Sequence, residues 1–243
     1  MTIAFAIALD GPAASGKSVV GRLLARKLGC RFLDTGLMYR VITWAALEAR
    51  VDPKNAAKLQ RLAQDLPVQI TFDGDGQASV SVGGKDATPH LRDVAVEQAV
   101  SQVSQAAGLR DVMVAQQRRL AQEGGIVMAG RDIGTVVLAD APVKVFLTAS
   151  VQERARRRHA EMEARGDKTT YEEVLADLQR RDTIDSERKV SPLRPAPDAH
   201  VVVTDGMDVE QVAQFLLAMI KRRFPQGRSR QVGTSPLERE KLE

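Results

Sequence analysis

The stretch GPAASGKS has the residue types and spacing of a loop that binds phosphate groups. It fits the pattern G-x-x-x-x-G-K-[ST], follows an apolar run, and opens a segment whose apolar residues recur at helical spacing. Backbone N–H groups of such a loop hold phosphate oxygens, while Lys17 would reach the β- and γ-phosphates and Ser18 suits Mg²⁺. A plain glycine turn is the alternative, which this context disfavours. The predicted ATP-binding residues are Gly11, Pro12, Ala13, Ala14, Ser15, Gly16, Lys17 and Ser18.

A second stretch, RRDTIDSER, places charges of both signs close together. On a helix, Arg181, Asp185 and Arg188 fall within about 60° of one another, and Val174 and Leu178 continue the same stripe. A face that extends an apolar stripe turns toward protein rather than water. We therefore predict that these three residues line a site, whereas Arg180 and Glu187 are ordinary surface charges.

Two further charged segments follow predicted strands. In DTGLMYR, Asp34 and Thr35 suit either a helix cap or a ligand, and Arg40 lies one turn into the next helix. In GRDIGT, glycines flank the Arg131–Asp132 pair, which favours a backbone approached by a ligand over a simple surface ion pair. The strand before GRDIGT ends in Ala129, so the usual acidic Mg²⁺ partner at that strand end is absent. Beyond Ser18, the sequence leaves the metal ligands open.

Short apolar runs that alternate with helical periods must position these residues. Such alternation predicts an α/β fold with a parallel sheet, and near-continuous apolarity indicates strands covered on both faces. The five predicted sheet strands are Ile3–Leu9, Arg31–Asp34, Ile126–Ala129, Lys144–Thr148 and His200–Thr204. Ligands bind such sheets at the carboxyl ends of the strands, where the phosphate loop and both charged segments would lie.

A different texture interrupts the strands and helices. VQITF, DGDGQ and ASVSV predict a β-hairpin inside an inserted subdomain at about residues 36–124. We expect one domain over residues 1–224, with its core at 1–35, 125–150 and 198–224 and a helical lid at about 151–197. Residues 225–243 are expected to form a disordered tail.

Composition excludes several classes of protein. With 44% hydrophobic and 27% charged residues the chain is an ordinary globular one, and it has no apolar run long enough to span a membrane. The single cysteine cannot form an intrachain disulfide, which fits a cytoplasmic protein. Of the net charge of +4, the surplus lies in residues 221–243, where seven basic side chains face three acidic ones; residues 1–220 hold 28 of each sign. This neutral body does not favour a nucleic-acid partner.

The segments GPAASGKS, LDTGLMYR, SQVSQAAGLR, AGRDIGTVVLADAPVKVFLTAS and RRDTIDSERKVSPLRP together resemble the bacterial cytidylate kinases, nucleoside monophosphate kinases with the P-loop fold. They run from Gly11 to Pro195. The resemblance implies a five-stranded parallel sheet flanked by helices, an inserted monophosphate-binding subdomain with the hairpin, and a helical lid. It also implies Mg²⁺ with ATP as the phosphoryl donor, CMP or dCMP as the acceptor, and a monomer.

Carried over by position, the resemblance assigns the acceptor side of the site. Lys17, Arg131, Arg181 and Arg188 would be catalytic, and Arg40, Arg131 and Arg188 would hold the acceptor phosphate. The cytosine would be read by Ser101, Arg110 and Asp132, and the ribose by Asp185 with Arg181; Asp34 and Thr35 complete the expected substrate-binding set.

The residue chemistry agrees with cytosine as the base. Cytosine presents an amino donor beside two acceptors, so Asp132 and Ser101 can accept from the amine while Arg110 donates. Uracil reverses two of these groups and would leave buried partners unpaired, at about 1 to 3 kcal/mol each.

The expected reaction is in-line transfer from ATP to CMP, giving ADP and CDP, through positioning and charge neutralisation without a dedicated base. Two alternatives stay open: a P-loop kinase for another small molecule, and a nucleotide-binding switch with a nucleic-acid partner on the basic tail. His90, His159 and His200 are scattered and predict packing rather than a metal site, as do Tyr39 and Trp44 rather than base stacking.

Overall fold

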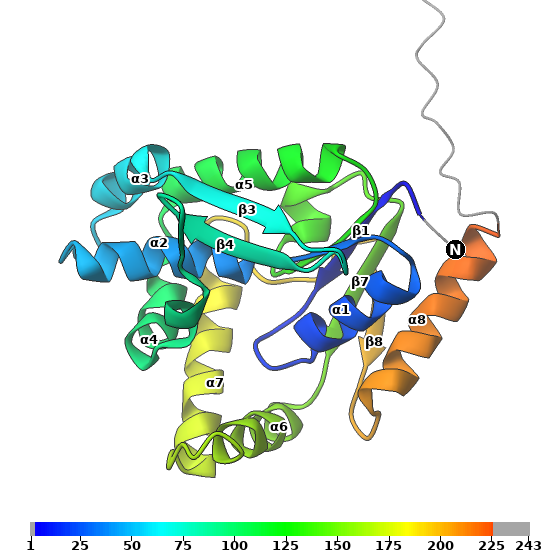
Figure 1. Cartoon of the computed structure of the whole chain (residues 1–243). Helices are drawn as coiled ribbons and strands as arrows, with labels where there is room; N and C mark the ends of the chain where they lie inside the picture. The colour runs from blue at the N-terminus through cyan, green and yellow to red at the C-terminus, as the bar shows by residue number, and fades with distance from the viewer. Residues whose placement is uncertain (1–2, 226–243) are drawn as a thin grey trace, which may run out of the picture.

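The computed structural model describes residues 3–225, and the predicted tail lies outside these residues apart from its first position. Its centre is a five-stranded parallel sheet in the order β2-β6-β1-β7-β8 (Figure 1). The chain thus leaves β1 toward one edge and later crosses to the other. Ligands bind α/β sheets at such a change of direction. The strands are β1 (Ala6–Asp10), β2 (Arg31–Asp34), β6 (Ile126–Gly130), β7 (Val143–Thr148) and β8 (His200–Val203).

Helices connect the strands and cover both faces of the sheet (Figure 1). A short π-helix, η2 (Ile133–Val137), directly follows the GRD segment after β6, and a short 3-10 helix, η1 (Thr88–Arg92), precedes α4. The α-helices are α1 (Lys17–Lys27), α2 (Gly36–Glu48), α3 (Ala56–Asp65), α4 (Val94–Val103), α5 (Ala107–Gln122), α6 (Val151–Glu163), α7 (Tyr171–Glu187) and α8 (Val209–Arg223).

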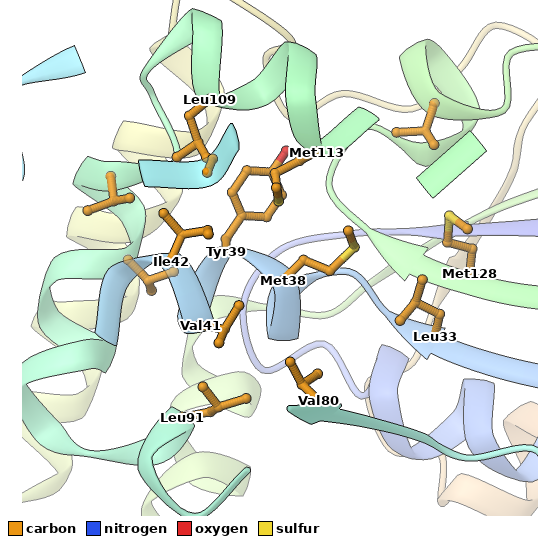
Figure 2. Close-up of a cluster of buried hydrophobic side chains, with 14 of the residues drawn as sticks. Leu33, Met38, Tyr39, Val41, Ile42, Val80, Leu91, Leu109, Met113 and Met128 are labelled. Carbon is orange, nitrogen blue, oxygen red and sulfur yellow. The ribbon is translucent and has the colours of Figure 1, made fainter. Parts of the chain in front are cut away.

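The two faces of the sheet bury separate cores because successive strand residues point in opposite directions. In β6, Val127 packs with α1 and α8, whereas Met128 packs on the other side with α2, α4 and α5. Figure 2 shows this second core, in which Met38 and Tyr39 of α2 lie between β2 and α5. Both cores hold fully buried aliphatic side chains, which fixes the strand ends that carry the site.

The predicted hairpin is present as β3 (Val68–Phe72) and β4 (Ala78–Val82), paired antiparallel, with β5 (Lys85–Asp86) added beside β4. Alternate residues of β3 face the core of α2 and α5, in keeping with its alternating sequence. A single bridge between Phe32 and Gln77 links this small sheet to β2.

The first strand differs most from its prediction, while β6, β7 and β8 each differ by one residue at one end. The apolar run Ile3–Leu9 predicted a strand from its first residue, but β1 begins at Ala6 and extends to Asp10. Ile3 and Phe5 are buried in the α1–α8 core without belonging to the strand, since apolar burial does not require strand pairing. Asp10, polar but buried, is the true strand end.

Within the described residues, no helix is long and apolar enough to cross a lipid bilayer.

Candidate active site

The loop Gly11–Ser18 runs from the end of β1 into α1 at the carboxyl edge of the sheet. Gly11 has a φ of 149°, and a Cβ there would lie 1.9 Å from the carbonyl oxygen of Leu147, so only glycine lets the loop pass this close to β7. Lys17 curls over the loop, and its Nζ donates to the carbonyl of Pro12 at 2.5 Å and to Ser15 Oγ at 3.2 Å. Burial lowers the pKa of Lys17, and nearby Arg131 acts in the same direction. An added anion would therefore stabilise this ammonium group.

Ser18 and Asp34 form a pair of oxygen donors beside the loop. Ser18 Oγ donates to Asp34 Oδ2 at 2.6 Å. The sequence left the partner of Ser18 open beyond noting that no acid ends the strand before GRDIGT; in the structure the carboxylate beside Ser18 comes from Asp34 at the end of β2. Hydroxyl and carboxylate oxygens suit Mg²⁺. In residues 3–225 there is no cluster of three or more His, Cys, Asp or Glu side chains that could hold a metal, so an ion here would depend on this pair and on ligand oxygens.

Asp34 and Thr35 have different local roles. Asp34 Oδ1 accepts from the backbone N–H of Gly36 at 2.9 Å, so its side chain does cap the start of α2 while its other oxygen meets Ser18. Thr35 makes no side-chain cap; its Oγ1 donates to the carbonyl of Ala129 at 2.9 Å and ties α2 to β6.

Four arginines from separate parts of the chain meet opposite the phosphate loop. Arg40 comes from α2, Arg131 from the segment after β6, and Arg181 and Arg188 from α7 and its end. Arg131 Nε donates to Asp185 Oδ2 at 2.8 Å, which joins the β6 end to α7. The segment after β6 therefore does not pair Arg131 with its neighbour Asp132, the simple alternative from the sequence.

The predicted stripe on α7 is present. Val174, Leu178, Arg181 and Asp185 are the buried residues of this helix, and Arg188, the residue that caps its end, is also buried. Arg180 is exposed and pairs with Asp177 at 2.6 Å on the outer face. The predicted division of this segment into a buried stripe and exposed charges is therefore present; the role of the buried residues in a site stays a prediction.

The predicted base-reading residues lie together at the deep end of the site. Arg110 Nη2 donates to Asp132 Oδ2, and its Nη1 donates to the carbonyl of Ser104 at 3.3 Å. Both side chains of this ion pair are almost fully buried. The guanidinium lies 5.4 Å from the ring centre of Tyr39, and Ser101 is buried in the same wall. Charged groups withdrawn from water in this way are held by contacts to each other or to a ligand.

Several buried N–H groups of these arginines have no hydrogen-bond partner among the described residues. They are Arg110 Nε, Arg181 Nε and Arg188 Nη2. An unpaired buried donor is costly, and these three, one on α5 and two on α7 and its end, mark places for acceptor atoms of a ligand.

A single cavity of about 820 Å³ joins the phosphate loop to the arginines. Gly11 and Pro12 do not line it; Gly11 packs on β7, and Pro12 supplies the carbonyl that holds Lys17. The remaining predicted site residues all line it: Ala13, Ala14, Ser15, Gly16, Lys17, Ser18, Asp34, Thr35, Arg40, Ser101, Arg110, Arg131, Asp132, Arg181, Asp185 and Arg188.

The sequence did not single out Asp10, which supports the segment after β6. Its carboxylate accepts the backbone N–H groups of Ile133 and Gly134, both at 2.7 Å. Burial raises the pKa of Asp10 to about 6, although these two hydrogen bonds oppose the change. A Cβ on Gly134 would lie 3.3 Å from this carboxylate and from the Lys144 side chain. The glycine therefore makes room for these protein groups, whereas the GRDIGT segment had predicted room for a ligand.

Two further interactions of the site also escaped the sequence. Glu97 of α4 lies between Arg40 and Arg181. Arg154 of α6 is buried and donates to the carbonyl of Ala13 in the phosphate loop and, through both Nη atoms, to Asp182 of α7. For Arg154 the sequence offered one signal, its position early in a predicted lid helix. For Glu97, a lone acidic residue in an apolar helix, the sequence offered no signal.

Comparison with known proteins places the chain among relatives of similar length. A family model described as "Cytidylate kinase" matches residues 7–222. A cytidylate kinase of Mycolicibacterium paratuberculosis is 49% identical over 218 residues, which cover 89% of this chain and 95% of that protein. The corresponding enzyme of Geobacillus thermodenitrificans is 47% identical, over 90% of this chain and 97% of its own length. That of Bacillus licheniformis is 43% identical, over 89% of this chain and 96% of its own length.

Proposed function

The chain belongs to the cytidylate kinase family, and from this premise we propose that it transfers the γ-phosphoryl group of ATP to CMP, giving ADP and CDP. The observation that carries the proposal is the single cavity in which the phosphate loop faces a cluster of buried arginines. The phosphate loop on one side of the cavity suits the triphosphate of the phosphoryl donor. The unpaired arginine N–H groups on the other side suit the phosphoryl acceptor, so the two nucleotides would meet end to end.

The donor side binds ATP through the loop Gly11–Ser18 and Lys17. We propose that Ser18 and Asp34, with phosphate oxygens and water, hold Mg²⁺, whose charge would neutralise the triphosphate and draw electron density from the transferred group. Lys17, Arg131, Arg181 and Arg188 supply the remaining positive charge. Because the acceptor phosphate is already an anion, its oxygen attacks in line without a dedicated base.

The acceptor side reads cytosine through Arg110, Asp132 and Ser101. Asp132 and Ser101 accept from the exocyclic amine, and Arg110 donates to N3 and O2 from a guanidinium whose Nε is unpaired. Asp185 Oδ2 lies 2.8 Å from Arg131 Nε, so this carboxylate is beside the arginines that would hold the phosphate. From there it would accept a hydrogen bond from a hydroxyl of the neighbouring sugar. We include dCMP as a substrate, because the base and phosphate contacts do not depend on the 2′-hydroxyl.

The segments about residues 36–124 and 151–197 act as the monophosphate-binding part and the lid. Arg181 on α7 and Arg188 at its end line the same cavity as Arg40 of α2 and Arg131 after β6, so closure of the lid over them would exclude water that competes by hydrolysing ATP. We expect the monomer to be the active unit, working in the cytoplasm where nucleotides are interconverted.

A panel of nucleoside monophosphates tests the proposal directly. With ATP and Mg²⁺ present, we expect rapid ADP formation with CMP or dCMP and at least tenfold lower kcat/KM with UMP and AMP, because each mispaired buried group costs about 1 to 3 kcal/mol. Equal rates with UMP and AMP, or no stimulation by CMP, would reject the assignment. If a hydroxylated small molecule stimulated ADP formation and no monophosphate of the panel did, the result would favour another P-loop kinase.

The variant Arg110→Ala ties the base assignment to one side chain. We expect it to lose most of the preference for CMP over UMP while KM for ATP changes less than threefold, because Arg110 lies on α5, away from the phosphate loop. The ratio of kcat/KM for CMP and UMP is the measurement. Loss of ATP binding with the CMP preference intact would contradict the role given to Arg110.

A further inference from the structure

Glu97 lies at the meeting point of three helices that carry the acceptor side of the cavity. Its Oε1 accepts a hydrogen bond from Nε of Arg40 on α2 at 3.1 Å and lies 3.1 Å from Nη2 of the same guanidinium, and its Oε2 accepts from Nη1 of Arg181 on α7 at 3.1 Å. The carboxylate belongs to the first turn of α4 and lines the cavity. One acidic side chain thus holds two arginines that are 141 residues apart in the sequence.

The carboxylate is largely withdrawn from water and fully charged. Its side chain is 18% exposed, compared with 20% for Arg40 and 10% for Arg181. Burial opposes the charge, but Arg40, Arg181 and Arg158 together lower the pKa of Glu97 to about 2. Glu97 is therefore an anion throughout the pH range in which an enzyme of this kind works.

The arginines around Glu97 repel one another. Burial lowers the pKa of Arg181, and the neighbouring Arg131 and Arg40 lower it further, whereas Glu97 acts against them. Without an anion between them, flexible arginine side chains move apart or turn to solvent. Glu97 keeps Arg40 and Arg181 close before any phosphate has arrived.

The contacts leave donor capacity for a ligand. Glu97 engages Nη1 of Arg181, and Nε of the same residue is buried without a partner among residues 3–225. A second anion beside Glu97 would satisfy this donor while the existing bonds hold the guanidinium plane in place. The carboxylate and the phosphate would thus share Arg181.

We propose that Glu97 is a positioning residue that presets Arg40 and Arg181 for the phosphate of the acceptor nucleotide. The proposal rests on the proposed function: Arg40 is expected to hold the acceptor phosphate, and Arg181 supplies positive charge where that phosphate meets the transferred group. Preorganised donors bind an anion without the cost of ordering long side chains. The opposite possibility is that Glu97 competes with the phosphate for the arginines, in which case its removal would strengthen acceptor binding.

The test is steady-state kinetics of Glu97→Gln with CMP varied at saturating ATP. Glutamine keeps the shape and removes the charge. We expect KM for CMP to rise about tenfold, while KM for ATP and the ratio of kcat/KM for CMP and UMP change less than twofold. The matched control is Glu123→Gln, which breaks an exposed ion pair with Arg31 and should leave every constant unchanged.

Each other outcome overturns the proposal. An unchanged KM for CMP excludes a positioning role, a lower one makes Glu97 a competitor, and equal increases for CMP and ATP indicate general damage to the fold. If Glu97→Gln does not fold, Glu97→Asp replaces it; the shorter side chain cannot span both arginines, and KM for CMP alone should again rise. A wild-type protein that shows no preference for CMP would instead reject the proposed function.

Discussion

Three arginines on the acceptor side each face a different carboxylate of their own chain. Arg110 pairs with Asp132, Arg131 with Asp185, and Arg181 with Glu97. A buried guanidinium is costly without such a partner, and removing one member of a buried pair leaves the other charge uncompensated. The carboxylates therefore allow the protein to hold a concentrated positive site before it binds an anion.

At the residue scale, motif residues were predictable and their supporting partners were not. Arg131 and Asp132 stand in GRDIGT and Arg188 in RRDTIDSER, so a recognisable segment carries each of them. Glu97 and Asp10 act on residues 84 and 123 positions away. A lone acid in an apolar segment has no local pattern, and only the packing of the helices and the sheet brings it to its partner.

The raised pKa of Asp10 predicts that the stability of the folded protein depends on pH. The Asp10 pKa is raised from 3.8 to about 6, so between these values the folded protein binds a proton that the unfolded chain releases, and stability falls as pH rises through this window. At about 1.4 kcal/mol per pH unit, the stability of the wild type relative to Asp10→Asn should fall by about 3 kcal/mol from pH 4 to pH 7. Urea unfolding of both proteins at half-unit steps of pH measures this difference.

Asp198→Asn is the control for that experiment. Asp198 is exposed, and its hydrogen bond from Lys144 lowers its pKa, so it titrates below this window and the corresponding difference should stay flat from pH 4 to pH 7. A flat or rising difference for Asp10→Asn would mean that the Asp10 carboxyl is not held in the buried, hydrogen-bonded environment described.

At the scale of the element, α7 carries three acceptor residues and is fixed to the donor side at one point. Arg154 of α6, almost fully buried, donates to the carbonyl of Ala13 in the phosphate loop at 3.0 Å and makes a two-pronged pair with Asp182 at 3.2 and 2.6 Å. Asp182 adjoins Arg181 in the sequence. The position of the arginines on α7 is thereby coupled to the loop that holds the triphosphate.

Helical periodicity predicted which face of α7 is buried but not what that face contacts. Val174, Leu178 and Arg181 share a stripe in any straight helix of this sequence, since the stripe follows from 3.6 residues per turn. The partners Arg154 and Glu97 come from α6 and α4, whose docking depends on the tertiary structure. Helical periodicity therefore does not predict which helices α7 packs against.

Two identical substitutions on α7 separate the anchor from ordinary surface charge. Asp182→Asn removes the carboxylate from the buried fork of Arg154 and should lower the free energy of unfolding by about 2 kcal/mol. Asp177→Asn breaks an exposed pair with Arg180 and a 3.9 Å contact with Arg181, which keeps its closer partner Glu97 at 3.1 Å, and it should cost less than about 0.5 kcal/mol. Denaturant unfolding measures both.

The kinetic consequence of Asp182→Asn follows from the same contact. Because Arg181 and Asp185 move with α7, we expect kcat to fall at least fivefold while Asp177→Asn stays within twofold of the wild type. Equal losses in the two variants would show that Arg154 does not anchor the helix.

At the scale of the whole molecule, the sequence predicted the layers better than the strand boundaries. Apolar runs between helical periods gave all five strands, because strands covered on both faces must be apolar. The run at Ile3–Phe5 overshot β1, since burial in the α1–α8 core selects the same residues as strand pairing does. The buried charges at the strand ends, with Asp10 first among them, follow from the function of the site and break the apolar pattern.

The site ends before the basic C-terminal segment 221–243, and the family match extends only to its second residue. The described cavity is lined by residues up to Val212, the family match ends at residue 222, and residues 1–220 have as many acidic as basic side chains. A reaction contained in this part should not need residues 226–243. We therefore expect a chain that ends at Pro225 to keep kcat and both KM values within twofold and its Tm within about 2 °C.

The same truncation examines the alternative of a nucleic-acid-binding switch. Basic side chains that contact phosphate backbones give binding that weakens steeply with salt. We expect the full chain and the truncated chain to bind single- and double-stranded oligonucleotides equally weakly at 150 mM salt, since the surplus charge is small and the body is neutral. Tight, salt-sensitive binding by the full chain alone would give residues 226–243 a partner of their own. If that loss of binding came with unchanged CMP phosphorylation, the chain would have two separable activities; if phosphorylation fell as well, the catalytic unit would extend beyond the cavity.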